Sequence, residues 1–77
     1  MGWLMEQRIG FIGGGNMAGA LLRGLIHSGL SRAELLQVSD PSEERRRQLA
    51  DELGVTVSDD NRAVAAASDV VVLAVKP

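Results

Sequence analysis

Residues 8–18 have the sequence Arg-Ile-Gly-Phe-Ile-Gly-Gly-Gly-Asn-Met-Ala, which predicts a buried strand, a sharp turn and the start of a helix. A short apolar run that stops at a glycine cluster is typical of a fully buried strand. After the glycines the apolar spacing becomes helical through residues 16–28. Two neighbouring rows carry this spacing: Met17, Leu21 and Leu25, and Ala18, Leu22 and Ile26. The strand, turn and helix therefore follow one another directly.

The six residues at positions 13–18 fit the pattern G-x-G-x-x-[G/A] of dinucleotide-binding turns. In this interpretation Gly13 permits the tight turn, Gly15 lets a pyrophosphate approach the backbone, and Ala18 lets the helix pack close to the strand. The helix N-terminus offers N–H groups and a partial positive charge to the phosphates. The alternative is a glycine turn with a purely structural role.

The rest of the chain alternates strands and helices. Further strands are expected at residues 35–39, 55–57 and 70–75, and further helices at residues 40–53 and about 62–67. Gly29 and Gly54 are the expected ends of the first two helices. Strands that alternate with helices pair in parallel through right-handed crossovers. The predicted fold class is therefore α/β, a partial Rossmann-like doubly wound parallel sheet of four strands and three helices. The apolar run at residues 70–75 has the composition of a strand covered on both faces.

The second strand is followed by a helix start, in which Asp40 is the expected N-cap, Pro41 the first helical residue and Glu43 the partner in a capping box. Asp40 also stands where a dinucleotide fold places its ribose-binding carboxylate, which accepts from the hydroxyls of NAD(H) and repels the extra phosphate of NADP(H). The two roles do not exclude each other. Ser39 is a neutral donor at the same place. The arginines at 45–47 form either a solvated helix face or a source of contacts to a 2′-phosphate.

Composition and charge exclude several classes of function. The 77 residues carry 8 basic and 10 acidic side chains, a net charge of −2, which disfavours a nucleic-acid partner. The sequence has no cysteine and one histidine, so disulfides, thiolate metal sites and multi-histidine metal sites are excluded. No apolar run approaches the roughly 20 residues of a membrane helix. Residues 1–7 are expected to form a leader, because they lack signal-peptide features, and residues 8–77 are expected to form one domain, the N-terminal part of a dinucleotide-binding domain. We therefore expect a cytoplasmic protein with no membrane or nucleic-acid partner.

No side chain is a convincing catalytic group or metal ligand. His27 lies in the last turn of the first helix, where the helix dipole explains a basic residue, and far from the glycine turn. Asp59 and Asp60 are adjacent acids in a loop and are expected to cap the next helix. Lys76 follows the last strand at the edge where ligands bind in open α/β sheets, which predicts a binding role. The sequence therefore predicts a binding site without its own acid or base.

Residues 8–18, together with Ser-Asp-Val-Val-Val-Leu-Ala-Val-Lys-Pro at residues 68–77, resemble the N-terminal part of pyrroline-5-carboxylate reductase. The resemblance implies reduction of pyrroline-5-carboxylate to proline with NADPH or NADH, the last step of proline biosynthesis. It implies an N-terminal Rossmann domain and a C-terminal helical domain that dimerises and builds the substrate site. It further implies that the turn wraps the pyrophosphate, that residues 39 and 40 face the adenosine ribose, and that the last residues line the nicotinamide half. The implied cofactor-binding residues are Ile12, Gly13, Gly14, Gly15, Asn16, Met17, Ala18, Ser39, Asp40, Asn61, Ala74, Val75, Lys76 and Pro77.

The chain departs from this family in two respects. Asp40 stands where several relatives have a small neutral residue, which leaves the choice between NAD and NADP open. The family continues well beyond residue 77, so we expect the C-terminal domain with the imino-acid site to be absent, the chain alone to be inactive, and the parent to be a homo-oligomer. The apolar last strand predicts an isolated chain that is marginally stable or self-associates. The alternatives are a reductase of the hydroxyacid dehydrogenase type and a non-catalytic nucleotide-sensing module.

Overall fold

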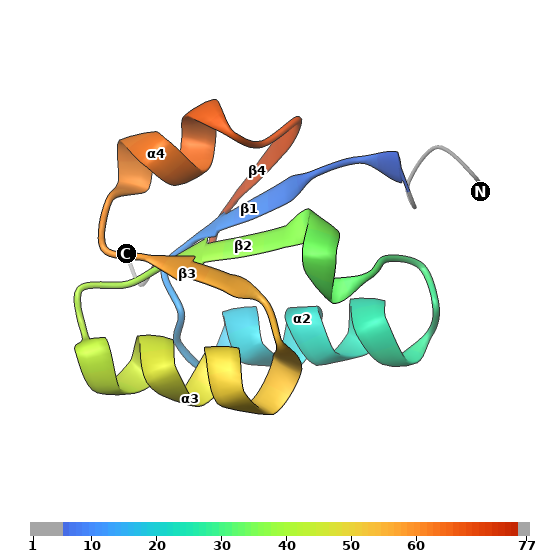
Figure 1. Ribbon diagram of the computed structural model, residues 1–77, viewed down its shortest axis with the longest axis horizontal. Helices are drawn as coiled ribbons and strands as arrows, with labels where there is room; N and C mark the ends of the chain where they lie inside the picture. The colour runs from blue at the N-terminus through green and yellow to red at the C-terminus, as the bar shows by residue number, and fades with distance from the viewer. Residues whose placement is uncertain (1–5, 76–77) are drawn as a thin grey trace.

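The computed structural model describes residues 6–75, which form a parallel sheet with helices on both faces (Figure 1). In chain order the elements are β1 (Ile9–Ile12), α2 (Asn16–His27), the 3-10 helix η1 (Ala33–Leu35), β2 (Leu36–Ser39), α3 (Glu43–Leu53), β3 (Thr56–Ser58), α4 (Asn61–Ala66) and β4 (Val70–Leu73). The sheet order is β3-β2-β1-β4, and every pairing is parallel. This arrangement confirms the predicted Rossmann-like α/β fold.

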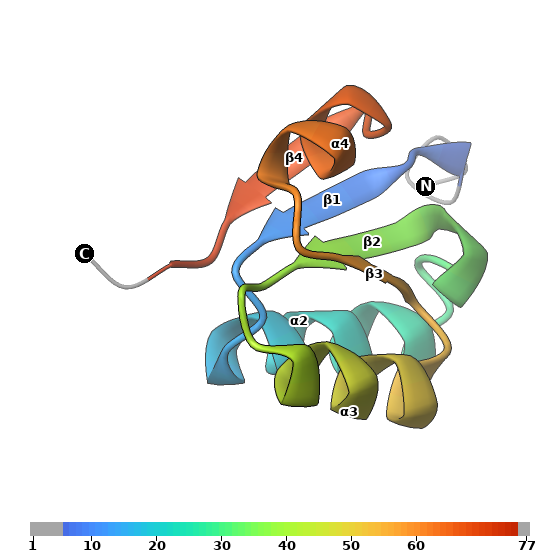
Figure 2. The ribbon, with the colours of Figure 1, turned by 60° about the vertical axis from the view of Figure 1, so that its left-hand side comes forward.

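The strand register brings the functional loops to one edge of the sheet. Ile12 at the end of β1 is paired with Ser39 at the end of β2 and with Leu73 at the end of β4. In Figure 2 the chain leaves β1 and β2 at this carboxyl edge and turns down to α2 and α3. The glycine turn, the loop after β2 and the loop after β4 are therefore neighbours.

The core lies between the sheet and the α2–α3 layer. Five large side chains are each almost completely buried, and they come from β1, β2, α2 and α3: Phe11, Leu22, Leu36, Val38 and Leu49. This burial of large apolar side chains is the main favourable contribution to folding. The core therefore fixes the start of α2 and the body of α3 relative to the carboxyl edge.

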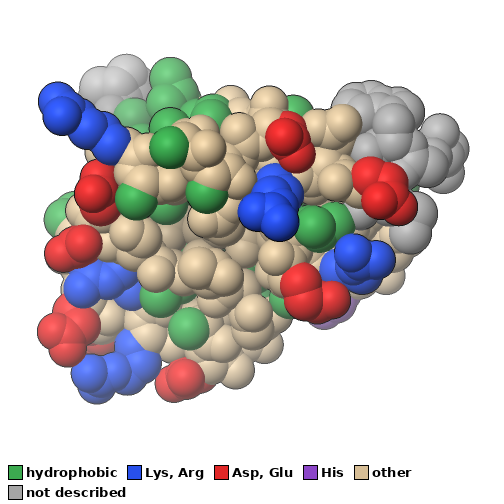
Figure 3. Space-filling model, turned by 45° about the horizontal axis from the view of Figure 1, so that its top comes forward, with side chains coloured by type: hydrophobic (Ala, Val, Ile, Leu, Met, Phe, Trp, Pro, Cys, Tyr) green, Lys and Arg blue, Asp and Glu red, His purple; other side chains and the backbone are tan. Residues whose placement is uncertain are grey.

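The opposite face of the sheet is covered by α4, which approaches β1 very closely. A Cβ added at Gly10 would lie 2.7 Å from Cγ1 of Val64 and inside contact distance of the Ser68 hydroxyl. A side chain at position 10 would therefore require Val64 or Ser68 to shift. Figure 3 shows this side of the molecule, where hydrophobic side chains lie at the surface and most charged side chains lie toward the margins.

The apolar residues of α2 and β4 are only partly buried. Leu22 and Ala18 of the first helix are buried, and Leu25 and Ile26 pack against the core, but Met17 and Leu21 are 53% and 44% exposed. The last strand is not covered on both faces within residues 6–75, since Leu73 is 71% exposed. This strand ends at Leu73 rather than Val75. Among the described residues no helix is both long enough and apolar enough to cross a membrane.

The start of α3 also differs from the prediction. Ser42 is the N-cap, and its hydroxyl accepts a hydrogen bond from the Arg45 N–H at 3.1 Å. Pro41 and Asp40 therefore lie before the helix, and the capping box with Glu43 does not form. The other helix ends follow the sequence. Gly29 and Gly54 have φ values of +76° and +73°, and Asp60 caps α4 by accepting from the N–H groups of residues 62 and 63.

Candidate functional site

The glycine turn connects β1 to α2 and is fastened to the two neighbouring strands. Gly13 has φ +102°, a conformation that an L side chain rarely adopts. Its N–H donates to the Ser39 carbonyl at 2.8 Å. The Ala74 N–H donates to the Ile12 carbonyl, also at 2.8 Å. Backbone hydrogen bonds thus hold the turn to both β2 and the segment after β4. The positive φ of Gly13 agrees with the prediction that this position needs glycine.

The third glycine of the turn faces open space. A Cβ built on Gly15 would meet no heavy atom within 4 Å. Gly15 is the N-cap of α2, and its carbonyl accepts the first helical bond from the Gly19 N–H at 3.0 Å. Ala18, by contrast, is fully buried against the core, which agrees with its predicted packing role. The start of α2 therefore presents N–H groups of its first turn beside an unfilled space at Gly15.

The Asp40 carboxylate is directed at the glycine turn. Its Oδ2 accepts from the Gly14 N–H at 2.9 Å, and its Oδ1 accepts from the Ser42 N–H at 2.8 Å. One carboxylate thereby joins the turn after β1 to the loop after β2. The carboxylate lies at the position predicted for ribose recognition, where its remaining lone pairs can accept further donors.

Ser39 and Asn61 form a pair at the same edge. The Ser39 side chain is fully buried, and its hydroxyl donates to Oδ1 of Asn61 at 2.5 Å. Asn61 itself is exposed at the start of α4. Because Oδ1 of Asn61 accepts from Ser39, its Nδ2 group is the donor that Asn61 can offer to a ligand. The Ser39 hydroxyl is therefore buried and already bonded to a protein group, so the predicted role of Ser39 at a ribose stays a prediction.

The three arginines of α3 have three different environments. Arg45 donates to the carbonyls of Gly14 and Gly15. Arg46 donates to the Asp40 carbonyl at 2.8 Å. Arg47 forms an exposed i,i+4 ion pair with Glu43 at 3.1 Å. Two of the three thus turn back onto the site backbone, which neither sequence interpretation of this run anticipated.

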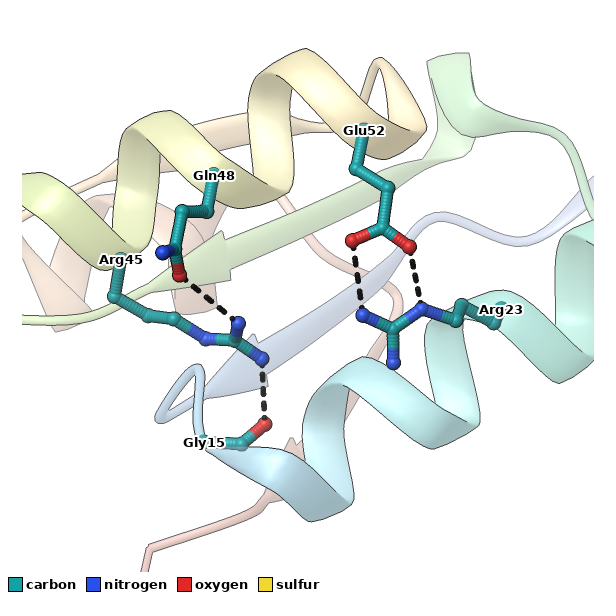
Figure 4. Close-up of polar contacts among 5 residues, drawn as sticks. All are labelled: Gly15, Arg23, Arg45, Gln48 and Glu52. Atoms are coloured by element: carbon teal, nitrogen blue, oxygen red, sulfur yellow. Dashed lines mark hydrogen bonds and ion pairs between the residues drawn. The ribbon is translucent and has the colours of Figure 1, made fainter.

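An ion pair also joins α2 to α3 beyond the site. Arg23 binds both oxygens of Glu52, at 2.5 and 2.9 Å (Figure 4). The hydrogen bond from Arg23 lowers the pKa of the Glu52 carboxyl and raises the pKa of Arg23. Both side chains remain well exposed, so the pair orients the two helices without a large contribution to stability.

The segment after β4 closes the other side of the turn. A Cβ on Gly13 would lie 2.9 Å from Cγ1 of Val75 and 3.0 Å from the Ala74 carbonyl oxygen. Ala74 is buried, and Val75 is exposed. Lys76 and Pro77, the remaining predicted contacts, lie outside the described residues. The structure therefore brings together the predicted residues of all three loops that it describes.

The other candidate groups stand apart from the turn. His27 is exposed in the last turn of α2, at the opposite end of that helix. Among residues 6–75 no three His, Cys, Asp or Glu side chains are grouped to hold a metal ion. Sequence reasoning missed Arg45 and Gly19, because their contact joins residues far apart in the chain. A glycine inside the helix was the available signal, but Gly24 gives the same signal without any close approach.

Comparison with known proteins agrees with this geometry. A pyrroline-5-carboxylate reductase from Pseudomonas aeruginosa is 46% identical over 74 residues, which are 96% of this chain and 27% of that protein. The reductase of the same name from Methanosarcina acetivorans is 44% identical over 72 residues, 94% of this chain and 27% of that protein. A solved structure of a pyrroline-5-carboxylate reductase from Coxiella burnetii superposes with a TM-score of 0.86 at 42% identity. The superposition covers 92% of this chain and 26% of the Coxiella burnetii chain.

The chain therefore spans about a quarter of the length of these relatives, and its resemblance to them is confirmed over that part. A family model described as NADP oxidoreductase, coenzyme F420-dependent, matches residues 8–77. That match includes every element of the sheet and all three loops of the site. The chain belongs to this family of NADP oxidoreductases.

Proposed function

We propose that this chain is the cofactor-binding part of a pyrroline-5-carboxylate reductase and binds NADH or NADPH at the carboxyl edge of its sheet. The observation that carries the proposal is the open space at Gly15 beside the first turn of α2. A pyrophosphate approaching there would meet backbone N–H groups and the positive end of the helix dipole. No Cβ would stand between the ligand and the backbone. Ile12, Asn16 and Met17 complete the proposed pyrophosphate contacts.

The adenosine half is proposed to lie over the loop after β2. Asp40 offers carboxylate lone pairs and Asn61 offers an amide donor, and both groups are accessible at this edge. A carboxylate favours the ribose hydroxyls of NADH, whereas Arg46 beside it supplies a positive charge for the 2′-phosphate of NADPH. The proposed site can therefore bind either NADH or NADPH.

The nicotinamide half is proposed to lie beside Ala74 and Val75, which adjoin Gly13. Lys76 and Pro77 extend the same proposed wall. When bound, the cofactor supplies the hydride that reduces the imine carbon of pyrroline-5-carboxylate to give L-proline. We propose that the residues of this chain bind and orient the cofactor and supply no acid or base to the reaction. This division of roles is typical of cofactor enzymes.

The whole protein's partners follow from the same proposal. The substrate site and the surface that forms a homo-oligomer are proposed to lie outside these 77 residues. A biosynthetic reductase of this kind is proposed to act in the cytoplasm. Identities of 41–46% to several pyrroline-5-carboxylate reductases support this assignment over a hydroxyacid dehydrogenase.

The test is a reductase assay on the protein that contains this chain. Loss of reduced-nicotinamide absorbance is followed after addition of pyrroline-5-carboxylate, and proline is identified by mass spectrometry. Parallel reactions contain a 2-oxo acid in place of the imine. The proposal predicts that the reduced cofactor is consumed with pyrroline-5-carboxylate and not with the 2-oxo acid. Turnover of the 2-oxo acid with no proline formed would support the hydroxyacid dehydrogenase alternative instead.

A further inference from the structure

The phosphate-facing turn has an unusual need for external support. Three consecutive glycines have greater backbone freedom than any other tripeptide, and ordering them costs conformational entropy. The Gly14 N–H is held by Asp40 at 2.9 Å. The carbonyls of Gly14 and Gly15 are held from α3, by the side chain of Arg45. Gly14 is thus fixed through both of its backbone polar groups.

Arg45 reaches the turn with the fork of its guanidinium. Nε donates to the Gly14 carbonyl, and Nη2 donates to the Gly15 carbonyl at 3.2 Å. Nη1 donates to Oε1 of Gln48, one turn further along α3, at 3.3 Å. Figure 4 shows the side chain extended from α3 toward the start of α2. All three nitrogens of the guanidinium are therefore oriented by specific acceptors.

The guanidinium lies against a glycine of α2. A Cβ at Gly19 would lie 2.8 Å from Nη2 of Arg45, and 3.2 Å from Nη1 of Arg23. Gly19 is also the residue whose N–H makes the first helical bond to the Gly15 carbonyl. The same carbonyl thus accepts from the helix and from Arg45. This shared acceptor fixes the turn relative to the first turn of α2.

The geometry of a trans peptide gives these contacts a consequence for binding. In a trans peptide the C=O of one residue and the N–H of the next point in opposite directions. When Arg45 binds the carbonyls of Gly14 and Gly15, the N–H groups of Gly15 and Asn16 are directed away from α3. These two N–H groups flank the Cα of Gly15, at which an added Cβ would meet no heavy atom within 4 Å and where the pyrophosphate is proposed to bind.

We infer that Arg45 is a positioning residue for cofactor binding, which acts on the pyrophosphate through the backbone of the glycine turn and not by contact with a 2′-phosphate. The inference rests on the proposed NAD(P)H site and adds to it a residue from a different element. Its distinguishing consequence is that NADH and NADPH lose affinity equally when the guanidinium is removed.

The first test replaces the guanidinium while keeping a long helix-forming side chain. Arg45→Met removes both donors to the turn, and Arg47→Met on the same helix removes the same charge from an exposed ion pair that does not touch the turn. Kd is measured for NADH and for NADPH by titration. Arg45→Met is expected to weaken both by about tenfold, whereas Arg47→Met changes either by less than about twofold. Loss of NADPH affinity alone would overturn the inference, as would no loss at all.

A lysine variant separates geometry from charge. Arg45→Lys keeps the positive charge but has no planar fork to hold two carbonyls. If Arg45 acts by positioning the turn, Arg45→Lys should lose most of the cofactor affinity that Arg45→Met loses. Full recovery of affinity in Arg45→Lys would show that charge alone suffices, which contradicts the inference.

A second test displaces Arg45 without altering it. Gly19→Ala places a methyl group where the guanidinium lies, and Gly24→Ala adds a methyl group to the same helix with no heavy atom within 4 Å. Both substitutions favour the helix. We expect both variants to keep or raise Tm, while only Gly19→Ala weakens both cofactors. Equal affinities in the two variants would contradict the inference.

A cofactor-independent readout keeps this inference distinct from the proposed function. Amide hydrogen exchange of peptides that cover residues 13–19 is compared in wild type, Arg45→Met and Arg47→Met. Faster exchange of this segment only in Arg45→Met is expected, and unchanged exchange would overturn the positioning role. If the wild-type protein bound neither cofactor, the proposed function would fail, and the exchange result would still decide whether Arg45 orders the turn.

Discussion

Substitution of Gly15 by alanine tests whether glycine is needed at this position for ligand binding or for folding. Gly15 has φ −73° and ψ −163°, which alanine adopts without strain. An added Cβ would meet no heavy atom within 4 Å. The described protein therefore gives no steric reason for glycine at this position.

The expected change in stability is the sum of two small opposing effects. Alanine is a poorer N-cap than glycine, at a cost of roughly 0.5–1 kcal/mol. It also restricts the unfolded chain, which stabilises the native state by about 0.4–1 kcal/mol. The free energy of unfolding of Gly15→Ala is therefore expected to lie within about 0.5 kcal/mol of wild type.

The expected change in binding is much larger. The proposed pyrophosphate approaches the backbone at Gly15, and a Cβ there prevents close approach. We expect Kd for NADH and for NADPH to rise at least about tenfold, which is about 1.4 kcal/mol. Denaturant unfolding and a fluorescence titration on the same samples measure the two quantities.

Gly13→Ala is the matched control within the same turn. Its φ of +102° strains an alanine, and the new Cβ would lie 2.9 Å from Cγ1 of Val75. We expect this variant to lose roughly 1–3 kcal/mol of stability. Wild-type affinity in a folded Gly15→Ala protein would refute the cofactor interpretation of the turn. A large loss of stability in Gly15→Ala would contradict the finding that a Cβ at position 15 meets no other atom.

Three further predictions concern stability and association. Gly10→Ala is expected to destabilise the protein by roughly 1–3 kcal/mol in denaturant unfolding, because the new methyl group meets Ser68; unchanged stability would contradict the close approach of α4. The lowered pKa of Glu52 means that its ion pair stabilises above the unfolded pKa of about 4.3 and is lost as pH falls through the lower folded value. Unfolding of Glu52→Gln should therefore depend less on pH in that acid range, and an identical pH profile would contradict it. The isolated chain is expected to self-associate in sedimentation, and Leu73→Lys on the exposed strand should increase the monomer fraction; a wild-type chain that is wholly monomeric would contradict this.

The local rules of sequence correctly predicted most of the fold. The change from a continuous apolar run to helical spacing located β1 and α2, and the alternation of elements indicated a parallel sheet. Glycine at helix ends was also predictive, since Gly29 and Gly54 have positive φ. These features depend on backbone conformation within a few residues, which a local sequence records directly.

The details of the site depend on contacts between distant segments. Asp40 and Ser42 are both good N-caps, so local sequence did not distinguish them. Asp40 lies 26 positions from Gly14, and its bond to that N–H leaves Ser42 to cap α3. Arg45 is 31 positions from Gly14 and was indistinguishable from its neighbours in the sequence. Only the tertiary arrangement shows which arginine turns toward the site.

The composition of β4 predicted a buried strand but did not show which elements would cover it. The apolar run of β4 is typical of a strand covered on both faces. Within residues 6–75 Val70 and Val71 are 38% and 42% exposed. The pattern therefore correctly identified the strand and its parallel pairing, but it did not identify its neighbours in space.

The central claim is that this chain holds a nicotinamide dinucleotide at the carboxyl edge of its sheet. Its most direct test is a titration of the folded protein with NADH and, separately, with NADPH, followed by nicotinamide fluorescence. The account predicts saturable binding of at least one cofactor, displaced by ADP-ribose, which shares the pyrophosphate. The ratio of the two affinities then decides between Asp40 and Arg46 as the determinant of cofactor choice. Absence of binding of either cofactor to a protein that circular dichroism shows to be folded would contradict the account.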